Sequence, residues 1–98
     1  MTEPSIIRED SETKGRYVAT LAGHPGEAEL TFSKASETLI IVDHTGVPDS
    51  LRGKGLAAAL SRRVIADARA AGQKIVPLCP FFRAFAARHP KETADVIA

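Results

Sequence analysis

The chain has 98 residues, of which 44% are hydrophobic and 26% charged, as in an ordinary soluble globular protein. Its formal net charge of +1 argues against a nucleic-acid-binding or membrane-surface protein, and no apolar run is long enough to cross a bilayer. The single cysteine, Cys79, excludes an internal disulfide and no signal peptide is evident, so we expect one cytoplasmic domain over residues 1–98.

The first part of the chain predicts two strands joined by a turn. An extended segment begins at residues 6–7 and runs into polar residues. We expect Lys14 and Gly15 to turn the chain back into a second strand over residues 16–22. Glycine and proline in residues 23–26 are typical of another turn.

A third and a fourth strand follow this turn. Ala28, Leu30 and Phe32 alternate with polar residues, which indicates a strand with one buried face. After a polar turn, residues 39–42 form a continuous apolar run. Such a run is typical of an interior strand that is covered on both faces.

The hydrophobic period changes in the second half and predicts a helix. Leu56, Leu60, Val64 and Ala68 recur every four residues, and Gly72 is placed to end the helix in a left-handed conformation.

A short strand and a second helix are predicted next. Residues 74–78 form the strand, in which Pro77 indicates an edge or a break in pairing because proline lacks an N–H. Cys79-Pro80 opens a helix over residues 81–88, and His89-Pro90 ends it, leaving a weakly specified tail. The order predicts an α+β fold with a mixed, mostly antiparallel sheet, a central helix and a C-terminal helix.

The segment most informative about function is residues 47–57, between the apolar strand and the long helix. Gly53 and Gly55 allow a ligand to approach the backbone closely, and the first turn of a helix has free N–H groups and a positive dipole end. Arg52 and Lys54 add positive charge. A phosphate-bearing ligand fits this pattern better than the alternative, a solvated helix start eased by glycine.

The spacing of the loop distinguishes between kinds of phosphate site. It fits neither a Walker-type loop nor a dinucleotide fingerprint, because no Gly-Lys-Ser/Thr and no third glycine are present. It fits Arg/Gln-x-x-Gly-x-Gly/Ala, with Arg52, Gly55 and Ala57 in the fixed places. In this it resembles the GNAT superfamily of acetyltransferases. The likeness covers about residues 15–90 and includes the other short motifs of a small GNAT-like subfamily: His44-Thr45, Val47-Pro48, Leu78-Cys79-Pro80 and Arg88-His89-Pro90.

The resemblance implies a GNAT-like fold that binds acetyl-CoA and transfers the acetyl group to an unidentified amine, on a protein or a small molecule. In that fold the strand over residues 39–47 parts from the strand over residues 74–78, and the pantetheine arm lies in the gap. The cofactor-binding residues implied are Val47, Arg52, Gly53, Lys54, Gly55, Leu56 and Ala57, of which residues 52–57 hold the pyrophosphate. No metal site is expected, and we expect a monomer or a weak homodimer.

Two side chains are candidates for the chemistry, each with an ordinary alternative. Cys79 precedes Pro80 and so lies at a helix N-terminus, where it either contacts or accepts the acetyl group or is a small buried residue. His44 ends the apolar strand and is either a base or a surface histidine.

Two departures from the subfamily pattern keep other functions open. Gly46 stands where relatives usually carry a glutamate, and Phe85 where they often carry a tyrosine, so a base and an acid for acyl transfer are missing. The alternatives are a non-catalytic module that binds or senses acyl-CoA, and a protein-interaction domain that has lost the ligand.

Overall fold

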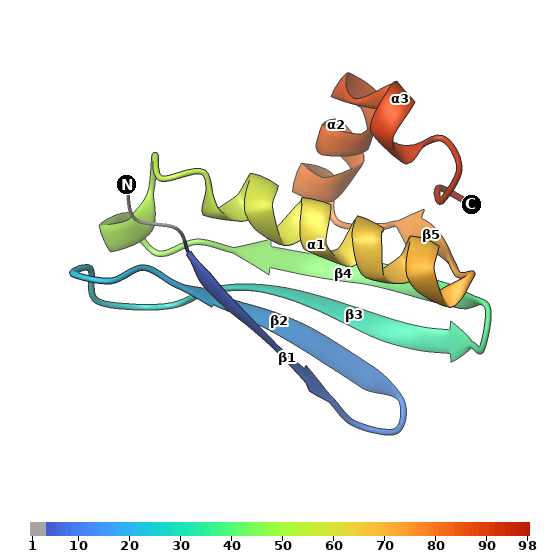
Figure 1. Ribbon diagram of the computed structural model, residues 1–98, viewed down its shortest axis with the longest axis horizontal. Coiled ribbons are helices and arrows are strands. Elements are labelled where there is room, and N and C mark those ends of the chain that lie inside the picture. The colour runs from blue at the N-terminus through green and yellow to red at the C-terminus, as the bar shows by residue number, and fades with distance from the viewer. Residues whose placement is uncertain (1–3) are drawn as a thin grey trace.

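The fold is a single mixed sheet with helices on one side (Figure 1). It is seen in a computed structural model that describes residues 4–98. The strands are β1 (Ser5–Asp10), β2 (Lys14–Thr20), β3 (Ala28–Ser36), β4 (Leu39–Gly46) and β5 (Lys74–Pro77), and they lie in this order in the sheet. The helices are α1 (Leu56–Ala71), α2 (Pro80–Arg88) and α3 (Pro90–Thr93), with a short 3-10 helix at Asp49–Leu51.

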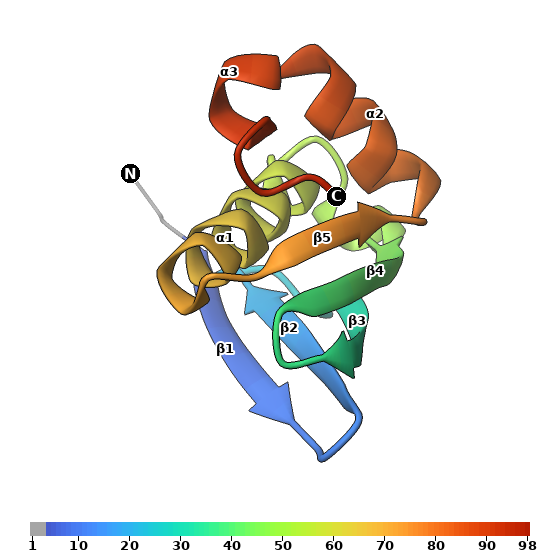
Figure 2. The same ribbon diagram turned by 90° about the vertical axis from the view of Figure 1, so that its right-hand side faces the viewer.

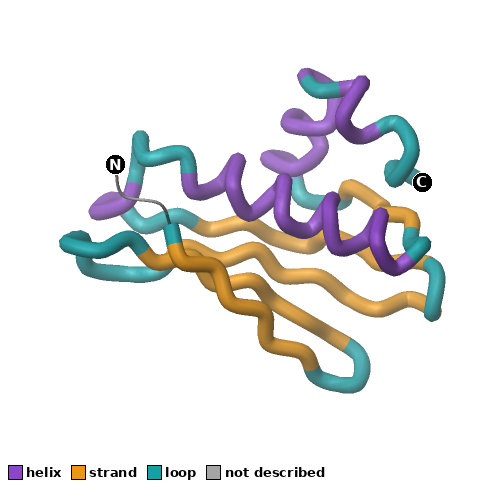
Figure 3. The backbone as a smooth tube through the Cα atoms, in the orientation of Figure 1, coloured by secondary structure: helices purple, strands orange, loops and turns teal. Residues whose placement is uncertain are grey.

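The connections confirm the predicted α+β class. Neighbours from β1 to β4 are antiparallel, and β5 is parallel to β4 because the chain crosses over through α1. Figures 2 and 3 show α1 across one face of the sheet, with α2 and α3 standing near β5. None of the helices in residues 4–98 is both long and apolar enough to span a membrane.

Only one face of the sheet is covered by helices among the described residues (Figure 2). Leu30 and Phe32 of β3 are buried beneath this layer, as their alternation predicts. In β4, Ile40 and Val42 are buried in the same way, whereas Ile41 is only partly buried. The prediction that this strand is covered on both faces is therefore wrong, because a continuous apolar run also occurs in a strand with a single helical layer.

Helix α1 follows its predicted pattern. Leu56, Leu60, Val64 and Ala68 are all at most 2% exposed and pack on the sheet. Gly72 has φ of 71° and its N–H bonds to the carbonyls of Ala68 and Arg69, which is the left-handed cap expected from the sequence.

The turn between β1 and β2 lies at residues 11–13, and not at Lys14 and Gly15 as predicted. The Ser11 N–H donates to the Lys14 carbonyl at 2.8 Å and closes this turn. Gly15 instead belongs to β2, where the ring of Phe32 covers it. A Cβ atom at this position would lie only 2.2 Å from Phe32 Cζ, so the glycine serves packing and not turning.

The C-terminal tail is more ordered than the sequence indicates. The Ile75 N–H donates to the Val96 carbonyl, the Ala98 N–H donates back to the Ile75 carbonyl, and Ile75 and Ile97 form a parallel bridge. Val96 is 2% exposed. The tail therefore covers part of the outer edge of β5, while Pro77 lies at the end of the pairing between β5 and β4, as its missing N–H predicts.

A polar cluster joins the edge strand β1 to α1. The Tyr17 hydroxyl donates to Asp67 Oδ2 at 2.7 Å, and Arg8 Nη1 lies 3.0 Å from the same hydroxyl and 3.3 Å from Asp67. Arg63 adds an ion pair to Asp67 at 3.1 Å. Burial raises the pKa of Tyr17. Burial also acts to raise the pKa of Asp67, but the hydrogen bonds that Tyr17 and Arg63 donate to this carboxylate outweigh it, so the pKa of Asp67 is lowered.

We expect Tyr17→Phe to lower the free energy of unfolding by about 1–2 kcal/mol, because the buried ring stays and its charge-assisted hydrogen bond is lost. Urea unfolding of Tyr17→Phe, Asp67→Asn and the double variant measures the coupling between the two side chains. Strictly additive effects of the two substitutions would show that this hydrogen bond contributes nothing.

Candidate functional site

The loop between β4 and α1 is anchored at both of its sides. Leu51 is fully buried in the core, and Val47 is partly buried against it. The Ser50 hydroxyl donates to the Pro25 carbonyl at 2.9 Å, which ties the loop to the turn between β2 and β3. These contacts fix the position of the chain immediately before Gly53 and Gly55.

Gly53 and Gly55 both adopt left-handed backbone conformations, with φ of 76° and 77°. A Cβ atom at either position would meet nothing within 4 Å, so the glycines are required by the backbone and not by crowding. Gly55 is the N-cap of α1, and no side chain of residues 4–98 caps the N-terminus of this helix.

The N–H groups of residues 53–58 have no hydrogen-bond acceptor within the described part of the chain. The N–H groups on either side are satisfied: that of Arg52 donates to the Asp49 carbonyl, and that of Ala59 to the Gly55 carbonyl. Free N–H groups at the positive end of a helix dipole form an anion site. These N–H groups overlap residues 52–57, for which the sequence predicts a phosphate site, and that role stays a prediction.

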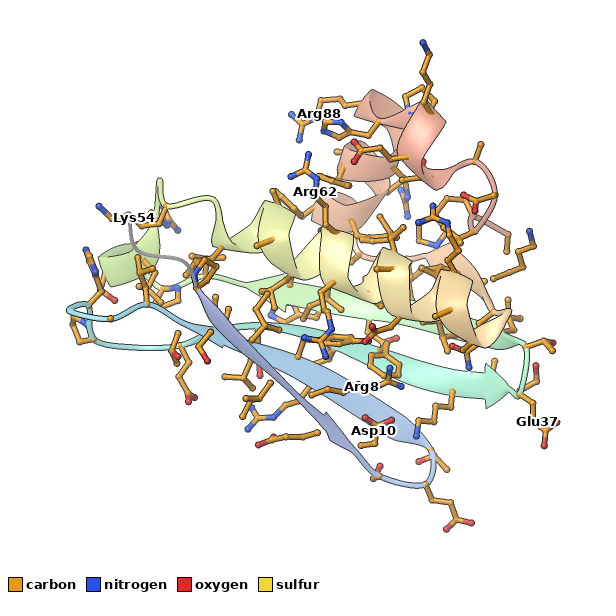
Figure 4. All side chains as sticks on the ribbon, in the orientation of Figure 1. Arg8, Asp10, Glu37, Lys54, Arg62 and Arg88 are labelled. Atoms are coloured by element: carbon orange, nitrogen blue, oxygen red, sulfur yellow. The ribbon has the colours of Figure 1, made fainter. Side chains whose placement is uncertain are left out.

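The charged side chains of this loop are exposed. Figure 4 shows Lys54 at the outer end of the loop. The Arg52 guanidinium lies 3.1 Å from the Asp49 carboxylate, in a pair in which both side chains are mostly exposed. Such exposed pairs contribute little free energy, so Arg52 is free to exchange Asp49 for another anion.

The strands β4 and β5 part at the end of the sheet that carries this loop. Their pairing runs from Leu39 with Lys74 to Val42 with Pro77, and the Cys79 N–H then donates to the Val42 carbonyl at 2.9 Å. The chain next enters α2, so residues 43–46 of β4 have no strand beside them on this side within residues 4–98. This unpaired stretch of β4 beyond the end of β5 is called the gap below, and it lies where the resemblance implies that the two strands part.

Cys79 lies at this gap. It is the N-cap of α2, followed by Pro80 in the first turn, and it is 3% exposed. Its thiol donates to the Thr45 hydroxyl, with 3.4 Å between sulfur and oxygen. Thr45 enters the sequence analysis only as part of the His44-Thr45 motif, and its contact with Cys79 is not predicted there.

His44 lies on the other face of β4. It pairs with Thr31 on the uncovered face, whereas Thr45 pairs with the buried Leu30. A Cβ atom at Gly46 would lie 3.1 Å from His44 Nε2, so the imidazole lies over this glycine. The structure therefore places both predicted catalytic candidates near the end of β4, but on opposite faces of it.

Phe85 and His89 pack against each other in and at the end of α2. Phe85 is 2% exposed, and its ring centroid is 4.4 Å from that of His89. The Arg62 guanidinium lies over the Phe85 ring, 5.1 Å from its centroid. His89 caps the C-terminus of α2, as predicted. Residues 4–98 contain no group of three or more His, Cys, Asp or Glu side chains that could hold a metal ion.

The sequence of the chain matches a known protein family over most of its length. A family model described as GCN5-related N-acetyl-transferase matches residues 16–96. The matched region runs from β2 to the C-terminal tail and includes the loop, the gap and α2, while β1 lies outside it. No curated protein matches the chain.

Proposed function

Because the chain belongs to the GCN5-related N-acetyltransferase family, we propose that it transfers the acetyl group of acetyl-CoA to an amine. The observation that carries this proposal is the row of free N–H groups at residues 53–58. A diphosphate presents several anionic oxygens in a row, which suits successive N–H donors at a helix N-terminus. Arg52 and Lys54 add charge around them.

The fit of the whole coenzyme depends on the gap as well as on the loop. Val47 and residues 43–46 lie between the anion site and the point where β5 leaves β4. We propose that the pantetheine arm pairs with the backbone of residues 43–46, which have no strand beside them on this side within residues 4–98. When bound, acetyl-CoA supplies the activated thioester.

We assign roles to Cys79 and His44 according to the face of β4 on which each side chain lies. Cys79 at the gap is placed to contact the thioester or to accept the acetyl group, with Thr45 holding its sulfur. His44, exposed on the opposite face of β4, is placed to take a proton from an incoming amine. Its imidazole takes up the space above Gly46, where relatives carry a carboxylate.

The second candidate function is a non-catalytic module that binds acyl-CoA, and Gly46 favours it because this position offers no acid or base. Release of free CoA during incubation with acetyl-CoA and a panel of amines distinguishes the two. An enzyme releases the thiol in an amine-dependent way, whereas a binding module shows heat of binding without release.

We expect Gly55→Val to weaken CoA binding roughly tenfold or more, because a β-branched residue disfavours the left-handed backbone that orients the loop N–H groups, and its side chain stands among them. The matched control is Gly72→Val at the other end of α1, where φ is 71° and space is equally open. Both variants bear similar strain of about 1–2 kcal/mol from the left-handed backbone. Calorimetry with CoA tests this, and equal losses of affinity in the two variants would contradict a phosphate site at Gly55.

Replacement of the thiol tests the assignment to Cys79. We expect Cys79→Ala to lose release of CoA while it keeps its affinity for acetyl-CoA, because the side chain lies at the gap and not at the loop. Intact-mass spectrometry of the wild type after incubation with acetyl-CoA should show an acetyl adduct that the variant lacks, if the thiol itself accepts the group. Unchanged CoA release in the variant would remove Cys79 from the chemistry.

A further inference from the structure

The uncovered face of the sheet carries a concavity of about 530 Å³. It is formed by side chains of β1, β2, β3 and β4 and by the turn between β1 and β2. Its lining includes Glu9, Lys14, Arg16, Thr31, Ser33 and Asp43. The helices lie on the opposite face of the sheet (Figure 2), and the lining reaches the core residue Phe32 beside Gly15.

Most charges around the concavity already have partners. Arg16 pairs with Glu9 at 2.6 Å and with Glu29 at 3.0 Å. Asp10 pairs with Arg8 at 2.7 Å, and the Arg8 hydrogen bond lowers the pKa of Asp10 to about 2 (Figure 4). These groups stabilise the hairpin and leave little charge for a ligand.

Asp43 differs from the other carboxylates of the concavity. It is partly buried, and its only side-chain hydrogen bond within the described residues is from the Ser33 hydroxyl, at 2.8 Å. No Lys, Arg or His nitrogen of residues 4–98 lies within 4.0 Å of it. A partly buried carboxylate with one neutral donor has free lone pairs and an unbalanced charge, which favours a cation.

The position of Asp43 connects the concavity to the gap. It follows Val42, whose carbonyl accepts the last hydrogen bond before β5 and β4 separate. The pairing of β3 and β4 is irregular here, and such a bulge allows Asp43 and His44 both to face the uncovered side, where His44 pairs with Thr31 and Asp43 accepts from the Ser33 hydroxyl. A cation bound to Asp43 thus lies beside the candidate base and at the start of the gap.

We infer that this concavity is the acceptor site and that it binds a protonated primary amine, with the ammonium group held by Asp43. This assignment rests on the acetyl transfer proposed above. In the reaction the amine nitrogen forms a bond to the acetyl carbon as the carbon–sulfur bond breaks. The ammonium group loses two protons, of which one ends on the sulfur of CoA and one passes to solvent through His44.

A titration with benzylamine and with benzyl alcohol tests the site without requiring turnover. The two probes have the same shape, but only benzylamine is charged at neutral pH. NMR spectra of the wild type with saturating CoA should show that benzylamine binds and shifts the amides around Asp43 and Ser33, and that benzyl alcohol binds much more weakly. We expect Asp43→Asn to weaken benzylamine binding roughly tenfold or more.

Two variants serve as controls of charge. Glu9→Gln alters a carboxylate that Arg16 already holds, so it should change benzylamine affinity much less than Asp43→Asn does. Lys14→Gln removes an exposed cation from the lining and should leave the affinity unchanged or raise it. Thermal unfolding of each variant shows whether it is folded.

The outcomes separate this inference from the proposed function. If CoA binds and benzylamine binds equally well to the wild type and to Asp43→Asn, or not at all to either, the acceptor site is not here. If CoA itself does not bind, the proposed function fails. Where turnover is measurable, Asp43→Asn should raise KM for benzylamine and leave KM for acetyl-CoA unchanged, and the opposite pattern would overturn the assignment.

Discussion

The architecture depends on one point in the sheet, where the Cys79 N–H donates the last hydrogen bond of the β5 segment to the Val42 carbonyl of β4. Pro77 has no N–H with which to extend the pairing, and Pro80 directs the chain into α2. Because β4 continues to Gly46 without a neighbour on this side in the described structure, its backbone stays open. The thiol of Cys79, the imidazole of His44 and the carboxylate of Asp43 all lie within a few residues of this point along the sheet.

The second constraint is that one helix serves both the core and the anion site. The buried side chains of α1 fix its axis across the sheet, and Leu51 fixes the 3-10 helix before it. The free N–H groups at the start of α1 are therefore held in place by packing around Leu56 and Leu60, and a ligand would not need to order them. The left-handed conformations of Gly53 and Gly55 leave these groups without an internal acceptor, which a regular turn would provide.

The sequence predicts those features that depend on local pattern. The four-residue period gives α1, the alternation gives β3, and the glycine spacing identifies the loop, because each follows from the geometry of its own element. It fails where the outcome depends on distant partners. The sequence wrongly predicts a turn at Gly15, because the Phe32 ring that packs over this glycine comes from another strand. The apolar run of β4 does not tell whether helices cover one face or two, and the pairing of the tail with Ile75 depends on tertiary contacts alone. The contact of Thr45 with Cys79 and the position of Asp43 are not predicted for the same reason. The contact joins residues far apart in the chain, and Asp43 is set apart by a bulge and by the lack of a cation within 4.0 Å among residues 4–98.

The account depends most on the free amides of residues 53–58 being donors to a diphosphate. The most direct measurement is an NMR titration of the ¹⁵N-labelled protein with CoA and, separately, with pantetheine, which lacks the diphosphate. We predict large shifts of these six amide protons with CoA and much smaller shifts with pantetheine. If the amides of residues 53–58 stay unshifted while CoA binds elsewhere on the protein, the central claim is contradicted.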